Sequence, residues 1–78
     1  MSLPTEVRAV AVDVLTEKQL EAFLYECAGI GPQRIARMVG VTKGAIVARL
    51  DGAHLKLYKA GVRQDEFGRW SLEEGVAA

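Results

Sequence analysis

The sequence predicts a mainly α-helical domain of three helices, with a short β-strand towards each end of the chain. Apolar residues that recur at spacings of three and four predict the helices, and glycines separate the periodic stretches. Alternating valines near the N-terminus predict strand instead. The chain has 78 residues, and a domain of this size buries only about 60% of the surface of its unfolded chain. We therefore expect a partner, such as a second copy, to add stability.

The N-terminal region is expected to form a strand over residues 6–14, in which Val10, Val12 and Val14 share one face. A second short strand is expected within residues 66–72. A lone strand would leave its backbone unpaired, so we expect the two terminal strands to pair, within one chain or between two. A two-stranded sheet is marginal in water, so this sheet must also lie on the helices or join strands of a second chain.

Three helices are expected over residues 16–28, 32–39 and 43–60. Each has a residue type that favours a helix start and a glycine that favours its end. The start residues are Thr16, Pro32 and Thr42, and the stop residues are Gly29, Gly40 and Gly61. A glycine inside a helix costs up to about 1 kcal/mol relative to alanine. Gly52 therefore predicts a bend or a close contact within the third helix.

The charges are unevenly distributed, although the formal net charge is zero. Residues 1–29 hold two basic residues (Lys or Arg) and five acidic residues (Asp or Glu). Residues 30–63 hold seven basic residues and one acidic residue, and residues 64–78 hold one basic residue and four acidic residues. A basic middle segment between acidic ends is typical of a surface that faces a polyanion. The alternative is an ordinary solvated helical face.

Residues 32–59 have the pattern of a helix, a tight turn and a second helix. Ala36 is small enough for the two helices to approach closely, and Gly40 is expected to make the turn. Ile46 and Leu50 are expected to anchor the second helix from behind. This pattern predicts a helix-turn-helix unit whose second helix enters the major groove of DNA.

This stretch resembles the four-helix DNA-binding domain of LuxR-type regulators and, equally, region 4 of bacterial RNA polymerase sigma factors. The resemblance covers about residues 15–59 and implies a DNA-binding role. The chain departs from both families at Val47, where they often carry a polar or basic residue, and at Asp51, where they often carry a basic one. The matching residues are Leu15, Thr16, Ile35, Ala36, Gly40, Val41, Ile46 and Leu50.

The expected DNA contacts come from the second and third helices. Arg49 is the candidate to read guanine through paired hydrogen bonds, and Lys43 is expected to touch a base or a phosphate. Ala45 and Val47 are expected to pack on thymine methyl groups. Side chains of the second helix, together with Lys56, are expected to hold phosphates. The full set of expected contact residues is Gln33, Arg34, Arg37, Thr42, Lys43, Ala45, Val47, Arg49 and Lys56.

The sequence predicts no enzyme, because no nucleophile, base and orienting group occur at plausible spacing. Cys27 and His54 are the single cysteine and histidine, so neither a disulfide nor a Cys/His zinc site is expected. We expect no cofactor, metal or small-molecule substrate. No signal-peptide pattern and no apolar run of about 18 residues are present, so a cytoplasmic protein without membrane contact is expected.

The leading expectation is a sequence-specific double-stranded DNA-binding protein. It would act as a small dimeric transcriptional regulator, with the helix over residues 43–60 in the major groove and the terminal strands holding the homodimer. One alternative is a protein-interaction module on a helix-turn-helix scaffold, because Val47, Ala48 and Asp51 suit a protein partner. Another is a phage-type terminase small subunit or recombination accessory protein, since those also open with a leucine-threonine helix.

Overall fold

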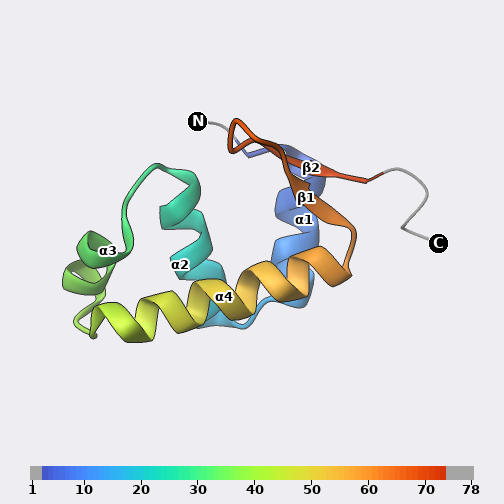
Figure 1. Ribbon diagram of the computed structural model, residues 1–78. Helices are drawn as coiled ribbons and strands as arrows, with labels where there is room; N and C mark the ends of the chain where they lie inside the picture. The colour runs from blue at the N-terminus through green and yellow to red at the C-terminus, as the bar shows by residue number, and fades with distance from the viewer. Residues whose placement is uncertain (1–2, 74–78) are drawn as a thin grey trace.

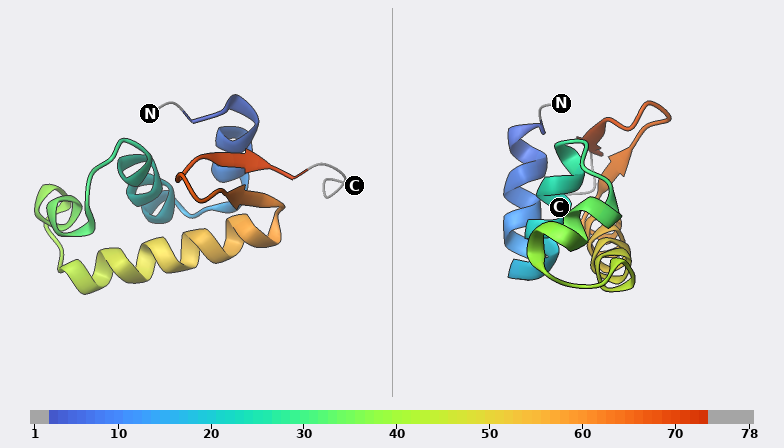
Figure 2. Two further views of the ribbon diagram at one scale, coloured as in Figure 1. Left: turned by 45° about the horizontal axis from the view of Figure 1, so that its top comes forward. Right: turned by 90° about the vertical axis from the view of Figure 1, so that its left-hand side faces the viewer.

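The computed structural model describes residues 3–73 and shows a mainly helical fold, which confirms the expected class. Helix α4 runs along one side of the molecule, and α2 and α3 pack against its inner face (Figure 1). Figure 2 shows the hairpin and α1 together over the C-terminal half of α4. The elements are α1 (Thr5–Val14), α2 (Glu17–Cys27), α3 (Pro32–Val39), α4 (Lys43–Lys59), β1 (Val62–Gln64) and β2 (Trp70–Leu72).

The expected strand over residues 6–14 is wrong, because this segment forms helix α1. Val7 and Ala11 lie one helical turn apart and are fully buried, whereas Val12 is 59% exposed. The spacing of the valines fits both the period of two of a strand and the period of 3.6 of a helix, and packing against β2 and α4 selects the helix. The helical stripe at i, i+3, i+4 and i+7 consists of Val7, Val10, Ala11 and Val14.

The three expected helices form within two residues of their expected ends, and α3 has the bounds predicted for it. The C-terminal strand also forms, but its expected partner does not. Strand β2 pairs instead with β1, a strand that was not expected, in an antiparallel hairpin. The paired residues are Val62 and Leu72, Arg63 and Ser71, and Gln64 and Trp70.

The hairpin turn is organised by the carboxylate of Asp65. It accepts hydrogen bonds from the backbone N–H groups of Phe67 and Arg69, each at 2.9 Å, and from Nε of Arg69 at 3.0 Å. These bonds, above all the one from the Arg69 backbone, hold the pKa of Asp65 below its usual value. Gly68 completes the turn with a φ of 82°. The hairpin is therefore a local unit that needs no N-terminal partner strand.

Buried side chains form two clusters that share α2 and α4. In the first, α1, α2, β1 and the C-terminal half of α4 meet around Phe23 and Leu57. In the second, α2 and α3 meet the N-terminal half of α4 around Ile35 and Ile46. Trp70 of the hairpin adds an edge-on contact to Phe23, with ring centroids 5.1 Å apart. Helix α4 is thus held along its whole length, but by different elements at each end.

Gly52 marks a close contact between α4 and the start of α2, which is one of the two expected alternatives. A Cβ atom at Gly52 would lie 2.8 Å from Nε2 of Gln19. The Gln19 amide is held in place, because its Oε1 accepts hydrogen bonds from the Thr16 backbone N–H at 3.1 Å and from Nζ of Lys56 at 2.9 Å. The bond with Thr16 is half of a capping box at the start of α2.

A second polar bridge joins α2 and α4 on the other flank of α4. Nε2 of His54 lies 2.6 Å from Oε1 of Glu26, and both side chains are about one-third exposed. The His54 ring also lies 5.5 Å from the Trp70 ring. Within residues 3–73, no helix has the length and apolar character needed to cross a membrane.

Candidate nucleic-acid interface

Helices α3 and α4 form the expected helix-turn-helix unit. Ile35 and Ala36 of α3 are buried against Ile46 and Leu50 of α4. Gly40 ends α3 with a φ of 76°, a left-handed conformation that favours glycine, and its N–H donates to the Ala36 carbonyl at 2.9 Å. The sequence predicted the role of each of these residues.

Thr42 begins α4 as its N-cap. Its hydroxyl oxygen accepts a hydrogen bond from the backbone N–H of Ala45 at 3.1 Å. A hydroxyl also has one donor, so Thr42 can cap α4 and donate to a phosphate at the same time. The helix start and the expected DNA contact are therefore compatible.

The buried residues of α4 mark its inner face, and the outer face is the side opposite them. Ile46, Leu50, Ala53 and Leu57 are buried, and 3.6 residues per turn place them on one side. Four exposed residues follow the opposite side, and we call them the outer stripe. They are Gly44, Ala48, Asp51 and Leu55.

The expected base-reading residues border the outer stripe rather than form its centre. Lys43 and Val47 are exposed on one border. Ala45 and Arg49 are half-buried on the other, where they share a flank of the helix with Lys56. Arg49 therefore reaches the outer surface only through the length of its side chain.

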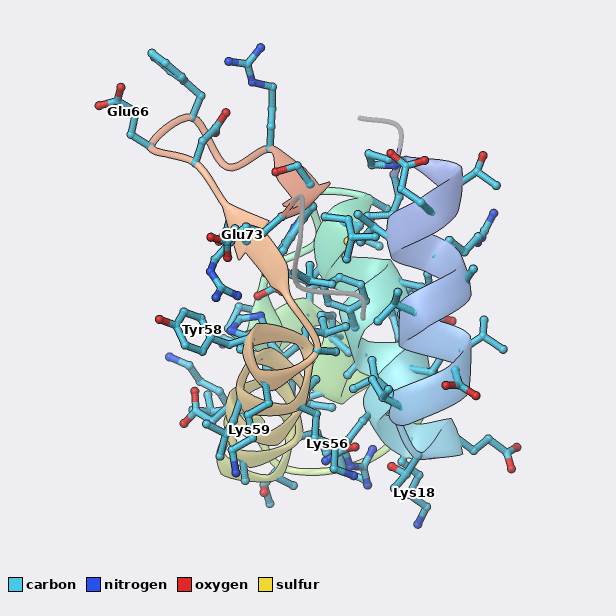
Figure 3. The ribbon with its side chains drawn as sticks, turned by 90° about the vertical axis from the view of Figure 1, so that its right-hand side faces the viewer. Lys18, Lys56, Tyr58, Lys59, Glu66 and Glu73 are labelled. Atoms are coloured by element: carbon cyan, nitrogen blue, oxygen red, sulfur yellow. The ribbon has the colours of Figure 1, made fainter. Side chains whose placement is uncertain are left out.

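Lys56 is engaged within the fold, because it donates to Oε1 of Gln19. Figure 3 shows Lys18, Lys56 and Lys59 towards one side of the molecule, at the end of α4. Sequence reasoning missed Lys18 as a member of this surface, since it belongs to α2 and lies 38 positions before Lys56. The contact between α2 and α4 brings the two lysines to one side.

Helix α3 exposes a polar face next to the start of α4. Gln33, Arg34 and Arg37 are all exposed there, opposite the buried Ile35 and Ala36. The ion pairs formed between residues 3 and 73 are His54 with Glu26, Arg63 with Glu73, and Arg69 with Asp65. None of them uses an arginine of α3, Lys43 or Arg49.

The expected contact residues therefore fall into two groups. Gln33, Arg34 and Arg37 lie along α3 and Lys43 begins α4, whereas Lys56 lies thirteen residues after Lys43, about 20 Å away along the axis of α4. Cations thus lie at both ends of the outer stripe. Such an arrangement can contact phosphates on either side of a groove that holds α4.

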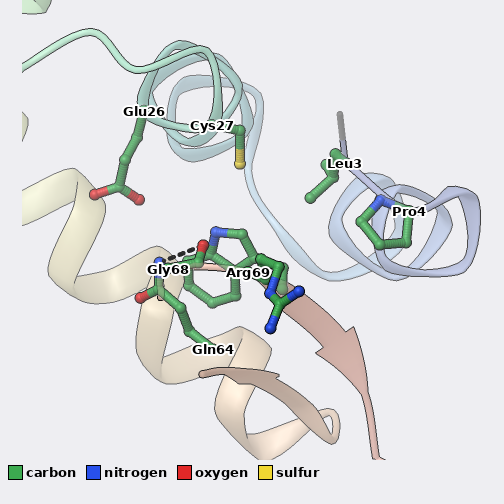
Figure 4. Close-up of a pocket in the computed structure, with 8 residues that line it drawn as sticks. Leu3, Pro4, Glu26, Cys27, Gln64, Gly68 and Arg69 are labelled. Carbon is green, nitrogen blue, oxygen red and sulfur yellow. Dashed lines mark hydrogen bonds between the residues drawn. The ribbon is translucent and has the colours of Figure 1, made fainter. Parts of the chain in front are cut away.

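A cavity of about 380 Å³ lies outside this interface, between the start of α1, the end of α2 and the hairpin (Figure 4). The sulfur of Cys27 points towards it. Burial, reinforced by the charge of Glu26 and opposed by that of Arg8, raises the pKa of Cys27 to about 11. The thiol therefore lines the cavity as an uncharged, weakly polar group near neutral pH. The cavity is lined by Leu3, Pro4, Glu26, Cys27, Gln64, Gly68, Arg69 and Trp70.

Among the residues described, no three His, Cys, Asp or Glu side chains converge to hold a metal ion. No protein-family model matches the chain, and neither the curated proteins nor the solved structures contain a significant match. The resemblance of residues 15–59 to LuxR-type and sigma region 4 domains stays a prediction from the sequence. Any functional assignment therefore depends on the geometry of α3 and α4.

Proposed function

We propose that this protein binds double-stranded DNA in a sequence-specific way and acts as a small transcriptional regulator. One observation carries the proposal: the turn at Gly40 and the buried contacts of Ile46 and Leu50 leave the outer stripe of α4 facing away from the other elements. The major groove is about 12 Å wide and admits one helix presented in this way.

The charges next to the outer stripe support the same proposal. Arg34 and Arg37 form no ion pair with any residue between 3 and 73, so their guanidinium groups are free to hold phosphates. Lys43 lies in the first turn of α4, where the free backbone N–H groups also favour an anion. Lys56 donates a hydrogen bond to Gln19, and it adds a cation at the other end of the stripe.

The test is selection of bound sequences from random duplex DNA at two salt concentrations. We expect an enriched motif and an affinity that falls steeply as salt rises. Arg34→Ala combined with Arg37→Ala should weaken binding to all sequences and reduce the salt slope by about two. Arg49→Ala should instead relax one position of the motif. Arg8→Ala on α1 is the matched control and should change neither. Binding without salt dependence or enrichment would contradict the proposal.

A second candidate, a protein-interaction module, is favoured by exposed apolar residues on α4. Leu55 of the outer stripe is 55% exposed, and Val47 and Tyr58 beside the stripe are 39% and 60% exposed. Such residues suit a protein partner better than a phosphate backbone. Under this reading, Lys43→Ala and Arg49→Ala leave binding to the partner intact, whereas Val47→Ser and Leu55→Ser abolish it. Ring-like oligomers in native mass spectrometry would favour the terminase-like alternative.

The homodimer remains part of the proposal, but the terminal strands do not explain it. Residues 6–14 are helical, and β2 is already paired with β1 of the same chain. Two half-sites are usual for a helix-turn-helix protein, so we still expect a palindromic motif and a complex containing two chains. A single chain bound to a motif without symmetry would contradict the dimer.

A further inference from the structure

Asp51 is the one acidic residue in residues 30–63, which hold seven lysines and arginines. Its side chain is exposed on the outer stripe, between Ala48 and Leu55. Between residues 3 and 73 it forms no ion pair and no side-chain hydrogen bond. The fold therefore gives this carboxylate no internal partner.

No ion pair along α4 accounts for the presence of Asp51 either. A cation three or four residues away on the same helix would pair with it. Those positions hold Val47, Ala48, His54 and Leu55, and His54 is engaged by Glu26. The carboxylate thus lies near the middle of α4 with its charge directed outward.

A carboxylate on this face has two opposite effects on DNA binding. It repels phosphates, and so it weakens binding to every sequence. The base edges in the major groove, however, differ: cytosine presents the N4 amino donor alone, adenine presents the N6 amino donor beside the N7 acceptor, guanine presents two acceptors, and thymine presents an acceptor and a methyl group. A carboxylate accepts a hydrogen bond from cytosine and is repelled by the acceptors. One residue can thereby favour one base and reject others.

The neighbours of Asp51 make its short side chain sufficient to reach a base. Gly44 and Ala48, which share the outer stripe with Asp51, have no side chain larger than a methyl group, so the N-terminal part of α4 can approach the bases closely. Asp51 lies eight residues after Lys43, about 12 Å along the helix axis. The width of the major groove admits a helix lying in it, so one helix can present both residues to the DNA.

We propose that Asp51 is a specificity-determining residue that selects cytosine at one position of the DNA site. The N4 amino group of that cytosine donates a hydrogen bond to the Asp51 carboxylate. This inference rests on the proposed function, because it requires α4 to lie in the major groove. The negative charge lowers affinity for DNA in general and raises discrimination between sites.

Asp51→Asn tests the inference, because asparagine has nearly the same shape but reads adenine through paired hydrogen bonds. Motifs are selected from random duplex DNA for the wild type and for the variant. We expect a cytosine of the wild-type motif to change to adenine. Relative to the wild type, preference for the cytosine site should fall roughly tenfold. Affinity for random duplex should rise, since one negative charge is removed.

Glu66→Gln is the matched control. It also removes one negative charge, but at the hairpin tip, which points away from the lysines at the end of α4 (Figure 3). Its motif should equal that of the wild type. An identical motif for wild type and Asp51→Asn, with the cytosine retained, overturns the inference and leaves the proposed function intact. No motif for the wild type overturns both.

Discussion

The contact between Gly52 and Gln19 makes a quantitative prediction about stability. In a helix interior, alanine is more favourable than glycine by about 0.8–1.0 kcal/mol. Gly52→Ala should gain this amount, but the new Cβ would lie 2.8 Å from Nε2 of Gln19 and must displace the amide. Displacement breaks the hydrogen bonds from the Thr16 backbone and from Lys56 to Gln19. The loss of these two bonds costs about 1 kcal/mol.

The gain and the loss nearly cancel in the single variant. We expect Gly52→Ala to change the free energy of unfolding by less than about 0.5 kcal/mol. Gln19→Ala removes the displaced amide, so Gly52→Ala in that background should stabilise by the full amount of about 1 kcal/mol. The coupling between the two substitutions is then about 1 kcal/mol, which a double-mutant cycle resolves.

Urea unfolding followed by far-ultraviolet circular dichroism measures the four free energies. The slope with denaturant should be the same for all four proteins, as a change in stability alone requires. Gly44→Ala is the control, because its Cβ would meet only Oγ1 of Thr42 at 4.0 Å. It should show no coupling to Gln19→Ala. A gain of about 1 kcal/mol from Gly52→Ala in both backgrounds would rule out the predicted coupling, since the amide would then impose no constraint.

Two further predictions concern buried groups. Ile46→Ala should lower the free energy of unfolding by about 2–5 kcal/mol, because Ile46 is fully buried between α3 and α4. Val47→Ala on the exposed side should change the free energy of unfolding by less than about 0.5 kcal/mol. Equal effects in urea unfolding would contradict the orientation of α4. The raised pKa of Cys27, about 11 instead of 9.0, should make its alkylation by iodoacetamide at about pH 8 roughly a hundredfold slower in the folded protein than in urea. Equal alkylation rates in the folded protein and in urea would refute the burial of the thiol. Because the folded state holds the thiol proton more tightly than the unfolded state, the contribution of Cys27 to stability is complete below pH 9.0 and is lost as pH rises towards 11.

Local signals predicted the helix-turn-helix unit well, because the sequence places a residue type that favours a helix start or a helix end at the boundaries of its helices. Thr16 and Thr42 accept the hydrogen bonds expected of N-caps, and Gly40 adopts the left-handed conformation expected of a helix end. The N-terminal segment was assigned wrongly for a physical reason. Its valines fit both a strand and a helix, and only contacts with β2 and α4, far along the chain, select the helix.

The candidate site was predicted less completely than the fold. Periodicity identified the inner face of α4, but the half-burial of Arg49 and the bond between Lys56 and Gln19 depend on where α2 lies. The same holds for Lys18, which tertiary packing brings to the side of Lys56 (Figure 3). Strand β1 has only three residues, too few to show a period of two on their own.

The zero net charge of the chain conflicts with DNA binding only if the charges are mixed in space. The structure separates part of them: Lys18, Lys56 and Lys59 lie towards one side of the molecule, whereas Glu66 and Glu73 lie on the hairpin side (Figure 3). Arg63 and Arg69 on that side pair with Glu73 and Asp65. A neutral protein with separated charges is oriented by a polyanion before contact, because one side is attracted while the other is repelled. Long-range attraction is weak in such a molecule, so under the proposed function selectivity would come from short-range contacts along the outer stripe. An unpaired carboxylate at Asp51 is consistent with that division, since it opposes general affinity where discrimination between bases would take place.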